Sequence, residues 1–308
     1  MKKVIFFTQN RWAFGSVHNG LCKELYKFDI LANIFDWTRD YTADEISMIS
    51  ESYDMIVTNP EFAGMLLLER NVPANKIIAV AHAQWDILYS NHKYGLSFLK
   101  DIKDYAVISN ILKMKSHEFG CPVIPKVVKY GLHFDLFYSK PSNKLKNVGY
   151  AGIKKTYNFY NQEIKRGNLS DLAIKLSGLN AVNNNNYNFL CMPTYYKSID
   201  AVIMSSTEEG GGLPMMEGAA AGKLCIGTPV GYFEENANLG GGIAVPLDTE
   251  SFLLETSNTL LFYKNNPEEY YKKCVDIQEY ARYNYDWSAV IDQWVSLLRK
   301  NTNDDGRI

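Results

Sequence analysis

The chain has 308 residues, which is long enough for two ordinary domains, and 46% of them are hydrophobic and 21% charged, as in water-soluble globular proteins. Its formal net charge of −2 provides no general attraction to nucleic acid or to an anionic membrane, so we expect no nucleic-acid partner. The five cysteines form no C-x-x-C pair, which favours buried thiols in a reducing compartment over disulfides or a zinc site.

The N-terminal segment MKKVIFFTQNRW turns polar after a short apolar run, so it predicts a first strand rather than a signal peptide. No stretch approaches the 18 apolar residues of a membrane span. We therefore expect a cytoplasmic protein and leave peripheral contact with a membrane open.

The first half of the chain alternates short apolar runs with helix-like segments. The expected strands cover 3–7, 29–35, 54–58, 76–82, 105–109 and 126–131. The expected helices cover 17–26, 43–51, 61–70, 94–101 and 111–119. Buried strands that alternate with helices of about ten residues predict an open, doubly wound α/β sheet with parallel strands.

A polar stretch with a proline, YSKPSNKLK at 138–146, predicts a linker, after which the pattern restarts. The expected strands of this half cover 146–152, 172–178, 187–191, 200–205, 223–227 and 242–246. The expected helices cover 159–166, 215–221, 249–264, 267–284 and 287–299. The pattern predicts two α/β domains, 1–140 and 141–286, with a final segment 287–308 and a cleft between the domains. Ligands would bind at the carboxyl ends of the strands.

Residues 208–222 read EEGGGLPMMEGAAAG. The glycines Gly210 to Gly212 permit positive φ and close backbone approach, Pro214 suits a first helical turn, and Gly222 suits a helix end. The stretch predicts a glycine loop that leads into a helix N-terminus, where free N–H groups and the positive end of the dipole favour an anion such as phosphate. Glu209 would lie in the loop and Glu217 on the helix.

Several other motifs are absent. GAAAGK at 218–223 is one residue too short for a P-loop, and Leu224 replaces the required Ser or Thr. No G-x-G-x-x-G follows the first strand, which disfavours a dinucleotide oxidoreductase. No H-E-x-x-H or paired Cys/His spacing predicts a metal site, and no G-x-S-x-G predicts a hydrolase nucleophile.

The run YYKSIDAVIMSSTEEGGGLPMMEGAAAGKLCIGTPVGYFEE at 195–235 resembles the retaining GT-B glycosyltransferases, most closely those of family 4. Glu209 and Glu217 have the E-x7-E spacing of that family, and Gly231 and Glu235 match its later G-x-x-E turn. The resemblance implies two Rossmann-like domains that face a central cleft, the GT-B fold.

Weaker matches extend the resemblance along the chain in the family's order. They are AVAHAQWD (79–86) with His82 at a strand end, VVKYGLHFDLF (127–137), VGYAGIKK (148–155), and YDWS (285–288). The last begins a helix that in the family crosses back to the first domain. By resemblance, 1–140 is the acceptor-side domain and 141–286 binds the nucleotide-sugar.

The resemblance implies metal-independent transfer of a sugar, with a hexose as the expected cargo, from a UDP- or GDP-sugar and with no permanently bound cofactor. The acceptor would be a glycan, a lipid-linked group or a protein. Glu217 would bind the ribose hydroxyls, and Glu209 would contact hydroxyls of the donor sugar. His82 would lie against the sugar from the other domain, while Gly15 and Ser16 would form a loop near the phosphates.

The diphosphate needs positive groups around it, because negative charge grows on it as the glycosidic bond breaks. The expected groups are backbone amides and two lysines: Gly211, Gly212, Leu213, Lys154 and Lys155. Tyr150 stands where the family usually has an arginine, and Arg11 after the first strand is the expected compensating cation. The segment 156–197 is also shorter than in the family, which predicts a smaller nucleotide-base pocket.

Two alternatives share the fold. A nucleotide-sugar 2-epimerase would carry a different set of acidic residues and histidines, so the Glu209–Glu217 pair argues against it. A non-catalytic nucleotide-sugar-binding relative stays open as a second alternative, because the arginine is missing and the segment of the base pocket is short.

Overall fold

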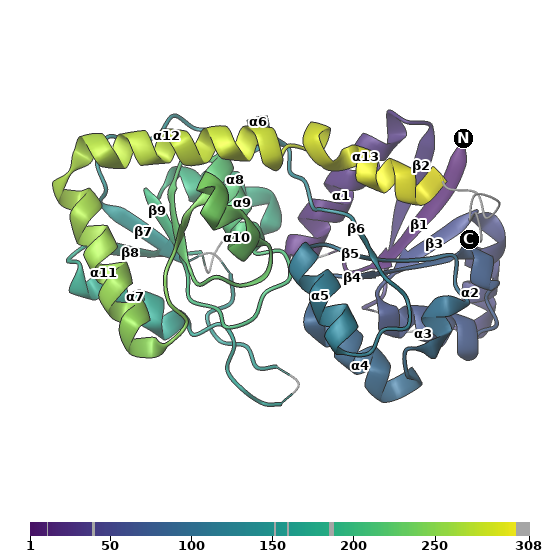
Figure 1. The fold of residues 1–308 in the computed structure, drawn as a ribbon. Coiled ribbons are helices and arrows are strands. Elements are labelled where there is room, and N and C mark those ends of the chain that lie inside the picture. Colours follow the sequence, from purple (N-terminus) through teal and green to yellow (C-terminus); the bar gives the residue numbers. More distant parts are fainter. Residues whose placement is uncertain (11, 39–40, 151, 159, 185–187, 300–308) are drawn as a thin grey trace. The chain divides into compact units, whose positions relative to one another are not determined.

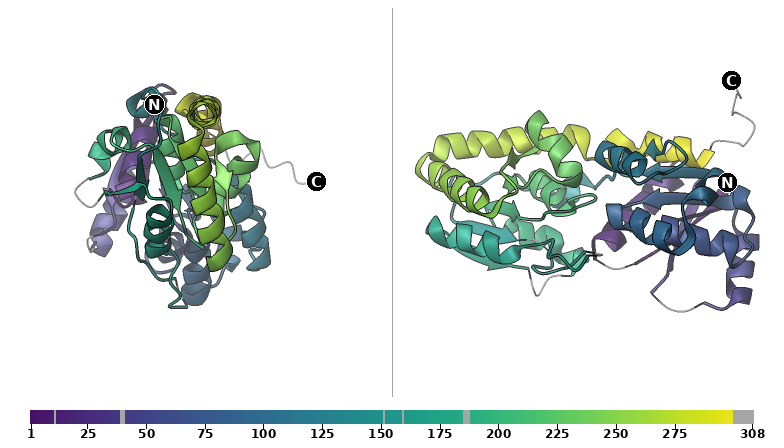
Figure 2. Two further views of the ribbon diagram at one scale, coloured as in Figure 1. Left: turned by 90° about the vertical axis from the view of Figure 1, so that its left-hand side faces the viewer. Right: turned by 60° about the horizontal axis from the view of Figure 1, so that its bottom comes forward.

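The structure is a computed structural model that describes residues 1–10, 12–38, 41–150, 152–158, 160–184 and 188–299. The chain divides into two compact units, which we name unit 1 (Met1–Gly131 and the chain from Trp287 on) and unit 2 (Leu132–Asp286). Each unit contains one parallel sheet with helices on both faces (Figures 1 and 2). The predicted doubly wound α/β fold with two sheets is confirmed.

The sheet of unit 1 has six parallel strands in the order β2-β1-β3-β4-β5-β6. The strands are β1 (Lys2–Thr8), β2 (Ile30–Asp36), β3 (Met55–Thr58), β4 (Ile77–Ala81), β5 (Asp104–Val107) and β6 (Lys126–Val127). Every residue of β3 and β4 is buried, as expected of strands covered on both faces. Successive strands are added outward in opposite directions from β1 and from β3, so the boundary between these two strands is the switch point of the sheet.

The helices of unit 1 are α1 (Trp12–Tyr26), α2 (Ala43–Ser52), α3 (Pro60–Leu68), α4 (Gln84–Tyr94), α5 (Asn110–Glu118) and α13 (Trp287–Arg299). Helices α1 and α13 pack together on one face of the sheet, and α3, α4 and α5 cover the other (Figure 1). Trp294 on α13 donates from Nε1 to the carbonyl of Lys129 at 2.8 Å. Trp287 packs so tightly on Gly131 that a Cβ there would lie 2.5 Å from its ring. These contacts attach α13 to unit 1.

Unit 2 has five parallel strands in the order β11-β10-β9-β7-β8, with its switch point between β7 and β9. The strands are β7 (Asn147–Tyr150), β8 (Asn180–Asn183), β9 (Ala201–Met204), β10 (Leu224–Gly227) and β11 (Ile243–Ala244). The helices are α6 (Phe134–Phe137), α7 (Gly167–Leu176), α8 (Met192–Lys197), α9 (Leu213–Ala220), α10 (Gly231–Asn236), α11 (Thr249–Asn265) and α12 (Pro267–Asn284). Helix α12 packs on α9, and α11 packs on α7.

Three predicted elements of unit 2 are wrong. In the helix predicted at 159–166, residues 160–163 instead lie in a turn closed by an antiparallel bridge between Tyr157 and Glu163, 164–166 are irregular, and residue 159 lies outside the described residues. The apolar run at 172–178 lies mostly in helix α7, whose buried residues Gly167, Ser170, Ala173 and Ile174 follow a helical period. Residues 189–191 form a 3-10 turn before α8, not a strand. Short apolar runs do not distinguish a strand from one face of a helix.

One prediction for unit 1 is also wrong. The helix expected at 94–101 is replaced by α4 at Gln84–Tyr94 and a short 3-10 turn at Ser97–Lys100. Helix α4 buries only Asp86, Ile87 and Ser90, so its sequence carries no strong apolar stripe.

Candidate active site

The predicted glycine loop lies between β9 and α9, at the switch point of unit 2. Gly212 has a φ of 56°, which suits glycine, and it directly precedes Leu213, the first residue of α9. The first N–H groups of a helix have no partner within the helix, so this end of α9 offers donors to an anion. The structure thus confirms the loop-to-helix arrangement that the sequence predicts.

The turn at Gly231 packs against the backbone of this loop. Gly231 has a φ of 56°, and a Cβ on it would lie 2.5 Å from the carbonyl oxygen of Glu209 and 2.6 Å from that of Gly210. The N–H of Tyr232 donates to the Gly210 carbonyl at 3.0 Å. Only a residue without a side chain permits this packing, so the turn fixes the backbone that carries Glu209.

The carboxylate of Glu209 is held by two side chains. Ser206 Oγ donates to its Oε1 at 2.6 Å, and the ammonium of Lys165 forms an ion pair with the same oxygen. The side chains are 13% exposed for Glu209 and 23% for Lys165. A carboxylate and a cation therefore meet at the carboxyl edge of the sheet, still open to solvent.

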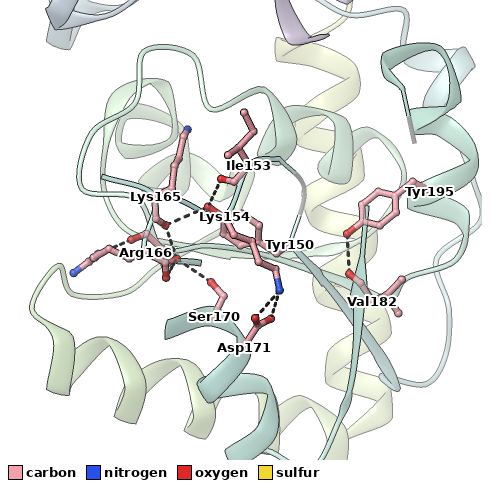
Figure 3. A network of polar contacts seen from close by, with 10 residues as sticks. Tyr150, Ile153, Lys154, Lys165, Arg166, Ser170, Asp171, Val182 and Tyr195 are labelled. Carbon is pink, nitrogen blue, oxygen red and sulfur yellow. Dashed lines mark hydrogen bonds and ion pairs between the residues drawn. The ribbon is translucent and has the colours of Figure 1, made fainter. Parts of the chain in front are cut away.

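A polar network holds the backbone of Lys165 in place (Figure 3). Its carbonyl accepts hydrogen bonds from Tyr150 at 3.2 Å and from Ser205 Oγ at 2.9 Å, and Ser170 Oγ donates to Ser205 Oγ at 2.9 Å. Burial raises the pKa of Tyr150, and the nearby Glu209 carboxylate adds to the effect, so the hydroxyl stays protonated. Tyr150, the residue in place of the family's arginine, thus orients a lysine.

Arg166 brings a second cation to this edge. Its Nε donates to the carbonyl of Ser205 and its Nη1 to that of Leu247, both at 2.7 Å. Its Nη2 is buried without a hydrogen-bond partner in the part of the chain that the structure describes. The carbonyls of Ser205 and Leu247 therefore fix the guanidinium of Arg166.

The two predicted lysines each contact another residue of unit 2, and their binding of the diphosphate stays a prediction. Lys154 forms an ion pair with Asp171 on α7, with Nζ 2.7 Å from Oδ1 (Figure 3). Lys155 is exposed, and its ammonium lies 5.6 Å from the centre of the Tyr157 ring. Its interaction with the Tyr157 hydroxyl raises the pKa of Lys155. Among the residues that the structure describes, Lys165 is the cation that pairs with Glu209, and sequence reasoning missed it. A helix start at Gly167, directly after Lys165 and Arg166, was the signal that could have found it.

Glu217 lies on α9 and is 7% exposed. Burial raises its pKa to about 7, although a hydrogen bond from Tyr196 at 2.9 Å partly offsets the effect. A carboxyl in this state is poised between its protonated and ionised forms near neutral pH.

His82 belongs to unit 1 and directly follows β4. It is 6% exposed, its Nδ1 is hydrogen-bonded to the hydroxyl of Tyr130, and its ring meets Phe14 edge-on. Its backbone N–H donates to Asp86 Oδ2 at 2.7 Å. Burial lowers the pKa of His82 well below its ordinary value, so the ring is neutral.

The loop expected around Gly15 and Ser16 is wrong, because both residues lie within α1. Their contact with phosphate stays a prediction. Arg11, the expected compensating cation, lies outside the described residues.

Metal clusters and membrane-spanning helices are both absent from the part of the chain that the structure describes. No three His, Cys, Asp or Glu side chains within the described ranges come together as a metal site. None of the helices described is both long and apolar enough to span a bilayer.

No family model and no curated protein matches the sequence. Solved structures do match over nearly the whole chain. Sucrose-phosphate synthase from Thermosynechococcus elongatus has a TM-score of 0.71 at 12% identity, covering 97% of this chain and 98% of that one. HepE from Anabaena, in complex with UDP-glucose, has a TM-score of 0.72 at 13% identity, covering 97% and 99%. A glycosyltransferase from Rickettsia africae has a TM-score of 0.67 at 16% identity, covering 96% and 98%. At such low identities the likeness identifies a fold, and the chain has the GT-B fold of two Rossmann-like units.

Proposed function

We propose that this protein is a metal-independent, retaining glycosyltransferase of the cytoplasm that moves a hexose from a nucleotide-diphosphate sugar to a glycan, lipid-linked or protein acceptor. The observation that carries the proposal is the Lys165–Glu209 pair, which lies at the switch point of unit 2 beside the glycine loop of α9. Doubly wound sheets bind their ligands at this point. Bound UDP-glucose in HepE, which has the same fold, favours a UDP-sugar as the donor.

The site offers fixed positive charge to a leaving diphosphate. As the bond from the sugar C1 to the diphosphate oxygen breaks, negative charge grows on that oxygen. Lys165 and the N-terminal end of α9 would stabilise this charge without a metal ion. Lys165 would exchange its partner Glu209 for the phosphate, which frees the carboxylate for hydroxyls of the sugar.

The proposed reaction breaks one bond and forms one. The acceptor oxygen attacks C1 from the side of the leaving group, so the anomeric configuration is retained, and the acceptor proton passes to an oxygen of the departing diphosphate. Glu217 would bind the ribose hydroxyls, and His82 would contact the donor sugar. The amides of Gly211, Gly212 and Leu213 would face the phosphates.

A thermal-shift screen against UDP, GDP, ADP, CMP and their sugars, with and without magnesium, tests the donor site. A ligand that binds only the folded state must raise the melting temperature. We expect a shift with one diphosphate series that magnesium does not change. With that donor and a panel of acceptors, NMR of the product should show retained configuration, and Glu209→Gln should abolish most turnover. A product with inverted configuration, or full turnover by Glu209→Gln, would contradict the proposal.

The second candidate is a non-catalytic nucleotide-sugar-binding protein. It is favoured by the same ion pair, because Lys165 is already neutralised by Glu209 in the free protein and no arginine stands at Tyr150. Tight donor binding, with no transfer to any acceptor and no release of free sugar, would support this second function.

A further inference from the structure

Two neutral histidines lie next to each other in the core of unit 1. His18 on α1 and His82 after β4 have ring centroids 5.6 Å apart in an edge-on arrangement. Both are buried, and burial lowers both pKa values, that of His18 to about 4. A neutral imidazole carries its single proton on either Nδ1 or Nε2, and the partner of Nδ1 decides which.

The partner of His18 is a carbonyl. Its Nδ1 lies 2.9 Å from the backbone oxygen of Phe14, four residues earlier on α1. A carbonyl oxygen can only accept, so the proton of His18 is on Nδ1.

The partner of His82 is the hydroxyl of Tyr130, which is 4% exposed. Within the described chain this hydroxyl makes no other hydrogen bond. If it accepted a proton from Nδ1, its own proton would be buried without an acceptor, which costs about 1–3 kcal/mol. The hydroxyl therefore donates to Nδ1, and the proton of His82 is on Nε2. Asp86 does not compete for the ring, because its carboxylate accepts from the backbone N–H groups of His82 and Ala83.

We propose that Tyr130 is a positioning residue that holds His82 in the Nε2–H tautomer. His82 then presents a hydrogen-bond donor, not a general base, to an oxygen atom of the ligand. The part of this inference that concerns the ligand depends on the proposed function, in which His82 contacts the donor sugar. The assignment of the tautomer does not depend on it.

Long-range ¹⁵N–¹H NMR of the ¹⁵N-labelled full chain at neutral pH tests the tautomer directly. We expect His82 to carry its proton on Nε2 and His18, in the same spectrum, on Nδ1. Tyr130→Phe should convert His82 to a mixture of tautomers. Tyr105→Phe is the matched control, because it removes another buried hydroxyl of unit 1, bonded to Ser116 at 3.0 Å, and should leave His82 unchanged. An Nδ1–H tautomer in the wild type, or an unchanged tautomer in Tyr130→Phe, would overturn the proposal.

Calorimetric titration tests the contact of His82 with the donor sugar separately from its tautomer. Tyr130→Phe should weaken the binding of UDP-glucose about fivefold, the value of one hydrogen bond, and should leave the binding of UDP alone unchanged. If Tyr130→Phe and wild type bind UDP-glucose with equal affinity, then Tyr130 does not orient His82 for the donor sugar. If wild type binds neither ligand, the UDP-sugar site fails while the NMR result still decides the tautomer.

Discussion

The ammonium of Lys165 pairs with the carboxylate of Glu209, which lies 44 residues further along the chain. Both ends of the pair are anchored, Lys165 through its carbonyl in the network of Figure 3 and Glu209 through Ser206 and the backbone that Gly231 supports. Because the pair is partly exposed, water screens it and its contribution to folding is small. Its position at the switch point supports the proposed role in ligand binding.

We therefore predict that Lys165→Gln changes the free energy of unfolding by less than about 1 kcal/mol. The same substitution should weaken the binding of the nucleoside diphosphate about tenfold or more, since a hydrogen bond to a charged group contributes about 1.5–3 kcal/mol. Urea unfolding and calorimetric titration measure the two effects. Lys175→Gln, an exposed lysine at the other end of α7, is the control that should change neither. If Lys165→Gln binds the nucleoside diphosphate with wild-type affinity, Lys165 does not contact this ligand.

Tyr150 and Tyr195 form a matched pair in unit 2, because each donates its hydroxyl to a backbone carbonyl at 3.2 Å, on Lys165 and Val182 respectively (Figure 3). We predict that Tyr150→Phe and Tyr195→Phe lose similar stability, about 1 kcal/mol each. Only Tyr150→Phe should weaken diphosphate binding, because only its hydroxyl orients Lys165. Equal affinities of the two variants, measured by titration with the diphosphate, would show that the network has no part in binding.

Glu217 should make the protein less stable as the pH rises. Its pKa of about 7 in the folded chain lies above its ordinary value of 4.5, so between these values the folded state holds a proton that the unfolded state has lost. Stability is then fully present below pH 4.5 and is lost as the pH rises through 7, by up to about 3 kcal/mol. We predict that Glu217→Gln, whose amide oxygen still accepts from Tyr196, is more stable than wild type at pH 8 and similar at pH 4.5. Denaturant unfolding at both values measures this, and an identical pH slope in both proteins would contradict it.

His18 should make the protein less stable as the pH falls, the opposite of the effect of Glu217. Its pKa of about 4 lies below the ordinary 6.5, so between these values the unfolded chain binds a proton that the folded chain excludes. The stability from the neutral, buried ring is present above pH 6.5 and is lost as the pH falls towards 4, by up to about 3 kcal/mol. In His18→Asn the amide keeps a donor near the Phe14 carbonyl and cannot titrate, so the loss between pH 7 and 4.5 should shrink. Denaturant unfolding at the two pH values measures this, and an unchanged loss in His18→Asn would contradict it.

Much of the fold follows from local sequence. Strands buried on both faces must be continuous apolar runs, so β3, β4, β9 and β10 are visible as such. Helix α7 was mistaken for a strand because its apolar run is short, and this error concealed Lys165 and Arg166 directly before it. Glycine spacing identified the loop with Glu209, since positive φ and close packing leave a mark in the sequence.

No local sequence pattern identifies the partners of the site residues. Tyr130 is 48 residues from His82, and Tyr196 is 21 residues from Glu217, so no local period relates either pair. The same holds for Lys165 and Glu209. These contacts depend on which strands are neighbours in the sheet, and on side-chain directions that only the folded chain determines.

Gly231 provides a test of the glycine turn behind the site. At this φ of 56° alanine is strained, and its Cβ would also lie 2.5 Å from the carbonyl oxygen of Glu209. We predict that Gly231→Ala displaces Glu209, lowers diphosphate binding and costs clearly more stability than strain alone. Gly120→Ala is the matched control, because Gly120 has a φ of 76° with no atom within 4 Å of the added Cβ, and it should cost only about 1–2 kcal/mol. If thermal unfolding shows the same loss for both variants, and Gly231→Ala binds the diphosphate like wild type, then this turn does not position Glu209.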